Sequence, residues 1–183
     1  MAAALYRFSA SLLFTLLLAG CASHSGRDVP GIKNFGKVSN DVWRGGKPDR
    51  QGMQTLADMG VKTIIDLQMD DESADVPPGV QYIPLRVSLW QCDKVDCDAV
   101  VKAIAGSPKP VFVHCLMGRD RTGLAIAAWR LTHGTDLDNV FAELDAYGVN
   151  TVWSGAIKER IRRLHREQNL SKYAEDSAAK VVE

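Results

Sequence analysis

Short apolar runs alternate with longer amphipathic stretches along the central part of the chain. The runs 61–67 (VKTIIDL), 80–85 (VQYIPL) and 110–115 (PVFVHC) are short and largely apolar, which predicts strands. A further strand-like segment at 41–44 breaks at two glycines. The 110–115 run is apolar on successive residues, as expected of a central strand that is covered on both faces.

Apolar residues at helical spacing predict helices between these strands and over the C-terminal half. Asp49 can cap a helix that Gly60 ends, and Gly106, Gly134 and Gly148 end three more. The predicted helices cover about 50–59, 98–106, 121–131, 136–147 and 154–169. This order of elements predicts an α/β fold with a central, largely parallel sheet flanked by helices and a helical C-terminal half.

The composition is that of an ordinary globular protein. The 183 residues suffice for one domain with a core, and 46% are hydrophobic and 24% charged. The 22 basic and 22 acidic residues cancel, so we expect no nucleic-acid partner. We predict a folded domain over 36–170, preceded by a flexible tether at 22–35 and followed by a frayed tail at 171–183.

Residues 1–21 have the pattern of a bacterial export signal. One positive residue precedes a short apolar run that ends at Leu18-Ala19-Gly20-Cys21. These four residues resemble a lipobox, and the resemblance implies that Cys21 becomes the lipidated first residue of a periplasmic protein. Its only contact with a membrane, the outer membrane, would then be the lipid anchor. The alternative is a plain secretory signal with a chance cysteine.

Three cysteines remain after Cys21, namely Cys92, Cys97 and Cys115. An odd number leaves at least one cysteine unpaired within the chain. Cys92 and Cys97 are close enough in sequence to form a small disulfide loop, which would leave Cys115 as the free thiol. The sequence has no CxxC pair and no His/Cys cluster with metal-ligand spacing, so a structural zinc site is not expected.

The stretch VFVHCLMGRDRTG at 111–123 carries the candidate chemistry. A strand delivers Cys115, and a helix begins near Arg121 and Thr122. Backbone N–H groups at such a strand–loop–helix junction attract anions, Gly118 permits a tight turn, and the Arg121 fork can hold two phosphate oxygens. The same positive field favours the nucleophilic thiolate form of Cys115, to whose sulfur Thr122 can donate its hydroxyl. The pattern predicts a nucleophile in a phosphate-binding loop lined by Leu116, Met117, Gly118, Arg119, Asp120 and Arg121.

The run HCLMGRDRTG resembles the His-Cys-x5-Arg-Ser/Thr signature of cysteine-dependent protein tyrosine phosphatases. The glycine that follows the signature, Gly123, resembles the pattern of the dual-specificity branch. Residues 42–67 resemble the opening helix and strand of bacterial and plant-fungal atypical dual-specificity phosphatases. Residues 93–104 (DKVDCDAVVKAI) resemble the acid loop and following helix of periplasmic bacterial tyrosine phosphatases. The likeness covers about residues 40–165. It implies a dual-specificity-phosphatase-like fold, in which Arg44 is expected to be structural.

The resemblance implies a two-step hydrolysis of phosphorylated proteins or small phosphate esters, without a metal or other cofactor. Cys115 attacks the ester to form a phosphocysteine, while Arg121 and the loop amides hold the phosphate oxygens. An aspartic acid protonates the leaving oxygen and then activates water. Asp93 aligns best with the family's acid. Asp96 stays open as the alternative, although an aspartate at the start of a helix is most simply an N-cap.

Three other interpretations stay open. Arg119 would suit an inositol polyphosphate, although Asp120 offsets that charge and a solvated pair is the simpler interpretation. Arsenate reductases and some rhodanese-like proteins share a related loop, and Cys92 or Cys97 could serve there as a resolving cysteine. A module that binds phosphorylated ligands without turnover is the third, and the nucleophile at Cys115 argues against it.

Overall fold

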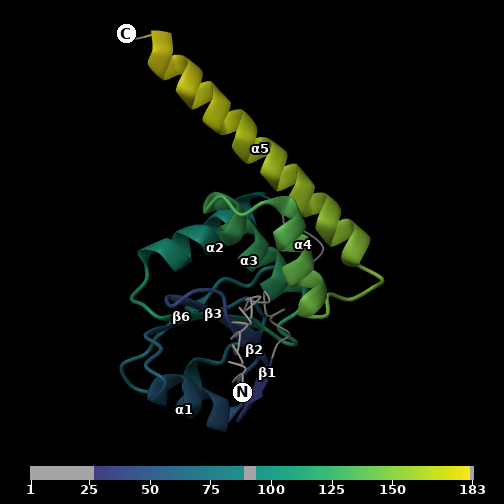
Figure 1. Cartoon of the computed structure of the whole chain (residues 1–183). Coiled ribbons are helices and arrows are strands. Elements are labelled where there is room, and N and C mark those ends of the chain that lie inside the picture. The colour runs from purple at the N-terminus through teal and green to yellow at the C-terminus, as the bar shows by residue number, and fades with distance from the viewer. Residues whose placement is uncertain (1–26, 89–93, 182–183) are drawn as a thin grey trace, which may run out of the picture.

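A six-stranded sheet forms the centre of the computed structural model, which describes residues 27–88 and 94–181 (Figure 1). The strand order is β1-β2-β3-β6-β4-β5. The pairs β1–β2 and β2–β3 are antiparallel, whereas β3, β6, β4 and β5 run parallel to one another. The largely parallel sheet is therefore confirmed. The strands are β1 (Arg27–Val29), β2 (Ile32–Lys37), β3 (Val42–Gly46), β4 (Thr63–Asp66), β5 (Gln81–Pro84) and β6 (Val111–Cys115).

Helices cover both faces of the sheet: α1 lies on one face, and α2, α3, α4 and α5 lie on the opposite face (Figure 1). Each face of the sheet packs against its own hydrophobic core, and successive side chains of β6 enter the two cores in turn, because side chains alternate along a strand. Phe112 packs in the core with Met53 and Leu56 of α1, and Val113 packs in the core with Leu124 of α3. The helices are α1 (Arg50–Asp58), the short 3-10 helix η1 (Ser73–Asp75), α2 (Lys94–Gly106), α3 (Asp120–Thr132), α4 (Leu137–Ala146) and α5 (Ser154–Val181).

The predicted helix boundaries are confirmed where a capping residue or glycine marks them. Asp49 accepts a hydrogen bond from the Gly52 N–H at 2.8 Å and caps α1. Gly60, Gly134 and Gly148 follow helices in the left-handed backbone conformation, with φ of 89°, 77° and 69°. That conformation favours glycine, which is why these residues end the helices.

The predicted tether at 22–35 is wrong for residues 27–35. They form β1 and most of β2, joined at Pro30-Gly31, and the side chains of Ile32 and Phe35 are buried in the core beneath α1. Asn34 lies between them with a left-handed backbone, at φ 54°. This conformation breaks the strict alternation of apolar and polar residues that would mark a strand in the sequence. The folded domain therefore begins earlier than residue 36.

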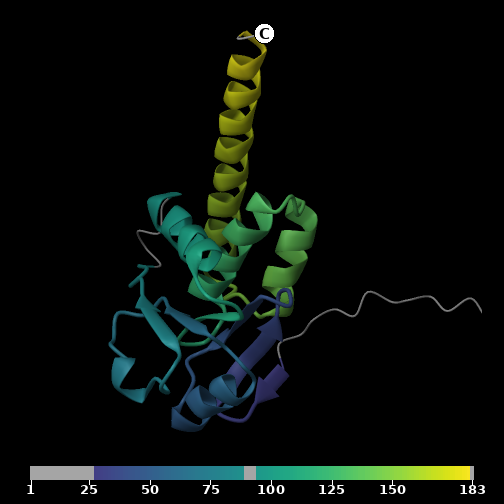
Figure 2. The ribbon, with the colours of Figure 1, turned by 90° about the vertical axis from the view of Figure 1, so that its left-hand side faces the viewer.

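The predicted boundaries of two helices also need correction. Helix α2 begins at Lys94, four residues before the predicted start at residue 98. Helix α5 runs on to Val181 and extends beyond the rest of the molecule (Figure 2), so the predicted tail is helical to that point. The sequence from 170 to 181 contains no glycine or proline that would end a helix. Within 27–88 and 94–181, no helix combines the length and apolar character needed to cross a bilayer.

Candidate active site

The carboxyl ends of three parallel strands meet at the loop formed by residues 115–121. Strand β6 ends at Cys115, which is buried and lies opposite Gly46 of β3. On the other side, His114 lies opposite Asp66 of β4. Helix α3 begins at Asp120, on the far side of the loop. This edge of a parallel sheet is where α/β proteins place their ligands.

The carbonyl groups of the loop point outward, onto the neighbouring strands. The backbone N–H of Lys47 donates to the carbonyl oxygen of Leu116 at 3.2 Å. The side-chain amide nitrogen of Asn34 lies 3.4 Å from the carbonyl oxygen of Met117 and 3.2 Å from that of Gly118. Within a trans peptide unit the N–H points away from the C=O. The N–H groups of residues 117, 118 and 119 therefore point to the opposite, concave side of the loop, which we call the cup.

Gly118 lets the loop lie directly against β3. Its φ is 68°, and a Cβ atom at this position would lie only 2.4 Å from the carbonyl carbon of Gly45. Gly46 is similarly crowded, since a Cβ atom there would approach the Leu116 carbonyl oxygen to 3.2 Å. Both the backbone conformation and the close contact therefore require glycine at 118.

Arg44 supports the same loop from within the protein. Its side chain is 1% exposed, and Nη2 donates to the Gly118 carbonyl oxygen at 3.1 Å. Nη1 pairs with Glu143 of α4 at 3.1 Å, and the guanidinium lies 3.8 Å from the ring centre of Tyr147. Burial lowers the pKa of Arg44, and the Glu143 carboxylate opposes this effect. Arg44 thus has the structural role that the resemblance implied, and that role is to hold the loop.

Arg121 and Thr122 lie where the loop enters α3. Nη1 of Arg121 donates to the carbonyl oxygen of Leu67 at 2.9 Å, which anchors the guanidinium at the end of β4. A guanidinium carries five N–H donors, so further donors remain for a ligand. Thr122 is fully buried, and within the described part of the chain its hydroxyl has no hydrogen-bond partner. An unpaired buried hydroxyl costs about 1–3 kcal/mol, so it is expected where a ligand or a reaction uses it.

The other predicted loop residues contribute mainly backbone. The side chains of Leu116 and Met117 are 57% and 41% exposed, and that of Arg119 is also exposed. The Asp120 carboxylate accepts a hydrogen bond from the backbone N–H of Asn150 at 2.9 Å. Asp120 therefore ties the segment before α5 to the start of α3, and Arg119 provides an exposed positive charge beside the cup.

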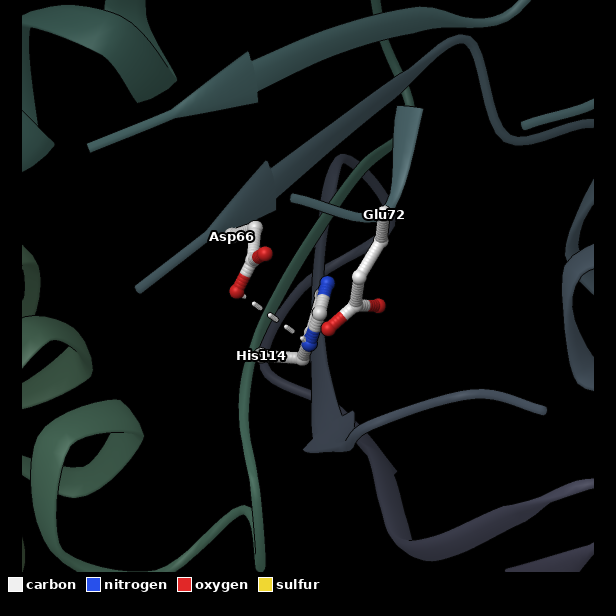
Figure 3. Close-up of side chains that lie close together, drawn as sticks. All are labelled: Asp66, Glu72 and His114. Carbon is white, nitrogen blue, oxygen red and sulfur yellow. Dashed lines mark ion pairs between the residues drawn. The ribbon is translucent and has the colours of Figure 1, made fainter. Parts of the chain in front are cut away.

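Asp66, Glu72 and His114 form a buried cluster next to Cys115, and Figure 3 shows the His114 ring between the two carboxylates. Nδ1 of His114 lies 3.8 Å from Oδ1 of Asp66. Asp66 also accepts hydrogen bonds from the Gln68 backbone N–H and the Tyr82 hydroxyl, each at 2.7 Å. The cluster thus connects the ends of β4 and β6, and the Tyr82 hydroxyl joins it from β5.

Burial determines the charges in this cluster. It lowers the pKa of His114 to about 4, against the attraction of Asp66, so the imidazole is neutral at pH 7. Burial and then the Asp66 charge raise the pKa of Glu72, which pairs with the Lys47 ammonium at 3.1 Å. The side-chain ligand atoms of Asp66, Glu72 and His114 lie within 4.8 Å of one another, close enough to hold a metal ion. Lys47, however, already supplies positive charge at Glu72, so a metal ion would have to compete with it.

Some predicted site residues fall outside the described part of the chain. Asp93, Cys92 and Cys21 are among them, so the roles predicted for these residues stay predictions. Asp96 is the third residue of α2 and does not precede it, which makes the predicted N-cap role wrong. Cys97 is buried in the core that also contains Cys115. The Cys92–Cys97 disulfide remains a prediction.

The sequence interpretation missed one residue that supports the loop, Asn34. Its amide also lies 3.0 Å from the carbonyl oxygen of Tyr147, so it links β2, the loop and the end of α4. The available signal was the Pro30-Gly31 pair between Val29 and Ile32, which is typical of a turn between two strands.

Comparison with known proteins places this fold and loop among phosphatases. Residues 38–135 match the family described as "Polymorphic toxin system, DSP-PTPase phosphatase". The dual specificity protein phosphatase TpbA of Pseudomonas aeruginosa is 26% identical over 119 residues, which are 63% of this chain. That match covers 55% of TpbA, so the chain spans about half the length of this curated relative.

Solved structures share the fold. The crystal structure of P. aeruginosa TpbA aligns with a TM-score of 0.69 and 22% identity, covering 80% of this chain and 97% of that one. A TpbA variant in complex with phosphotyrosine aligns with a TM-score of 0.65 and 22% identity, covering 73% of this chain and 89% of that one. The core catalytic domain of the PP-IP phosphatase SIW14 from S. cerevisiae aligns with a TM-score of 0.59 and 18% identity, covering 75% of this chain and 93% of that one.

The matched region 38–135 is more than half of the chain. It includes β3, with Arg44 and Gly46, and the whole 115–121 loop. The chain therefore belongs to the DSP-PTPase phosphatase family, within the cysteine-dependent protein tyrosine phosphatase superfamily.

Proposed function

We propose that the chain hydrolyses phosphate monoesters on proteins, at phosphotyrosine and also at phosphoserine or phosphothreonine, through a phosphocysteine at Cys115. One observation carries the proposal: the outward carbonyls of residues 116–118 leave three N–H groups facing the cup between Cys115 and Arg121. Such a set of donors matches the oxygens of a phosphate group. The dual-specificity relative TpbA, and its complex with phosphotyrosine, support this substrate class.

In the first step, the Cys115 sulfur attacks phosphorus and the bond from phosphorus to the ester oxygen breaks. The N–H groups of the cup and the remaining N–H donors of the Arg121 guanidinium stabilise the charge on the three equatorial oxygens. A carboxylic acid, Asp93 or alternatively Asp96, gives its proton to the leaving oxygen. The product alcohol departs, and the phosphoryl group remains on sulfur.

In the second step, the same carboxylate removes a proton from water, which attacks phosphorus as the bond to sulfur breaks. The Thr122 hydroxyl is buried and has no hydrogen-bond partner among the described residues, so it can donate to the sulfur as the sulfur regains its negative charge. Inorganic phosphate leaves, and the thiolate and the protonated acid are restored. Neither step requires a metal ion.

Steady-state hydrolysis of p-nitrophenyl phosphate and of a phosphotyrosine peptide by the full chain, with reductant and chelator, tests this proposal. We expect Cys115→Ser to abolish turnover and Asp93→Asn to reduce it much more than Asp96→Asn does. Wild-type turnover by Cys115→Ser would contradict the nucleophile assignment. If the wild-type chain binds phosphate without turnover, the binding module becomes the better interpretation, and turnover of arsenate with thiol oxidation would favour the redox alternative.

Inositol polyphosphates form a second candidate substrate class. The exposed Arg119 beside the cup offers a charge to a further phosphate group, and SIW14, a PP-IP phosphatase, shares the fold. Comparing kcat/KM for inositol hexakisphosphate and phosphotyrosine peptides, with Arg119→Ala beside the wild type, ranks the two classes. A loss in Arg119→Ala confined to the inositol ester would favour this second class.

We also propose that the protein is anchored in the periplasm, at the outer membrane, through a lipid on Cys21. The lipobox-like sequence before Cys21 is the support for this proposal. Expression in a bacterium followed by membrane fractionation, with Cys21→Ser as the comparison, tests it. Recovery of both proteins in the same soluble fraction would contradict the anchor.

A further inference from the structure

A groove of about 530 Å³ lies beside the 115–121 loop, next to the β1–β2 hairpin. This volume falls within the range of about 300–1,000 Å³ that is typical of ligand sites. We call it the Lys33 groove. Its lining includes Val29, Ile32, Lys33, Lys47, Leu116 and Met117.

The Lys33 groove borders the loop that forms the cup. Leu116 and Met117 belong both to the 115–121 loop and to the groove, and their large apolar side chains are 57% and 41% exposed. Exposed apolar side chains gathered next to a site are typical of an interaction surface. A substrate whose phosphate lies in the cup and whose chain extends toward the groove would cross these two side chains.

The charges of the groove favour an anion. The side chains of Lys33 and Lys47 are exposed, the latter by 40%, and the Glu72 contact raises the pKa of Lys47. The carboxylate of Asp49 also lines the groove, but it accepts the Gly52 N–H at the start of α1, where the helix dipole offsets its charge. Of the two lysines, Lys47 is already paired with Glu72, so Lys33 is the better candidate to meet a ligand.

We propose that the Lys33 groove binds the protein segment that flanks the phosphorylated residue of the substrate, and that Lys33 selects a carboxylate side chain in this segment. The inference rests on the proposed function, because the phosphate must first bind in the cup. An extended peptide advances about 3.3 Å per residue, so side chains two or three positions from the phosphorylated residue lie about 7–10 Å along the chain. Apolar parts of the segment pack on Leu116 and Met117, and its carboxylate meets Lys33.

The test compares phosphotyrosine peptides that differ only in glutamate or glutamine, placed two and three positions before or after the phosphotyrosine. For the full chain, we expect kcat/KM to be about threefold to fivefold higher for the better glutamate peptide, as an exposed ion pair provides. Lys33→Glu should remove or invert this ratio, and Lys33→Arg should keep it. Lys62→Glu is the matched control, since Lys62 is exposed and precedes β4, at the opposite edge of the parallel strands.

Hydrolysis of p-nitrophenyl phosphate, which has no flanking peptide segment, separates this inference from the proposed function. All four proteins should hydrolyse it within about twofold of one another. An unchanged glutamate preference in Lys33→Glu, or an equal loss in Lys62→Glu, would overturn the groove assignment. The assignment would also be overturned if the wild type showed no glutamate preference and the Lys33→Glu variant turned over inositol hexakisphosphate more slowly than the wild type. A wild type that cannot hydrolyse p-nitrophenyl phosphate would overturn the proposed function, and the groove inference with it.

Discussion

Asn34 gives the sharpest test of how the 115–121 loop is held. Its backbone has φ 54°, which glycine adopts easily, so Asn34→Gly removes the side chain without straining the backbone. The lost amide lies 3.2 Å from the Gly118 carbonyl oxygen and 3.4 Å from that of Met117. Arg44 still donates to Gly118 after the substitution, so the loop is loosened and not released.

The size of the effect follows from these contacts. A hydrogen bond contributes about 0.5–1.5 kcal/mol net, and the amide has two N–H groups to share among the loop and the Tyr147 carbonyl. We expect Asn34→Gly to cost roughly 1–2 kcal/mol of transition-state stabilisation, about a fivefold to thirtyfold fall in kcat/KM. Asn34→Asp should cost more, because a carboxylate oxygen then faces the carbonyl oxygens.

Steady-state hydrolysis of p-nitrophenyl phosphate by the full chain measures the loss of activity, and urea unfolding measures any loss of stability. Asn40→Gly is the control for backbone entropy, since Asn40 is exposed in the turn between β2 and β3. The fall should appear mainly in kcat, because the cup stabilises charge that develops in the transition state. Activity of Asn34→Gly within twofold of Asn40→Gly would refute the role assigned to this amide.

Three other predictions concern the loop, the N-terminal strands and the buried histidine. Gly118→Ala should destabilise the protein by roughly 2 kcal/mol or more in urea unfolding and abolish measurable turnover, because a Cβ atom would lie 2.4 Å from β3; near-wild-type values would contradict the geometry. A chain that begins at residue 36 should be insoluble or unfolded by circular dichroism, whereas one that begins at residue 27 should fold, because Ile32 and Phe35 belong to the core; equal stability of the two would refute this. Burial lowers the pKa of His114 from 6.5 to about 4. Between these pH values the unfolded chain therefore binds a proton that the folded chain does not. The free energy of unfolding should fall by roughly 3 kcal/mol from this group as pH falls from 6.5 to 4. Glu72 acts in the opposite sense because its pKa is raised, so a histidine-resolved NMR titration is the direct measurement, and a midpoint near 6.5 for His114 would contradict it.

The phosphate-binding loop could be predicted from the sequence because its chemistry is local. Cys115, Gly118 and Arg121 lie within seven residues, at the junction of an apolar run and a helical stripe. The strand β6, the helix α3 and the glycines that end the helices carry similarly local signals, in residue type and spacing. The α/β class follows from the order of these elements, and the structure agrees with it.

The contacts that support that loop could not be predicted, although Arg44 was expected to be structural, because they join residues far apart in the chain. Asn34 and Arg44 reach the Gly118 carbonyl across 84 and 74 positions, and only the pairing of β2, β3 and β6 brings them there. Asn34 itself lay in a segment without strand periodicity, since its left-handed backbone interrupts the alternation. The sequence by itself thus determined the reacting groups, whereas the tertiary structure alone decided which way the loop's N–H groups face, because the carbonyl of each peptide unit must find its partner on another strand.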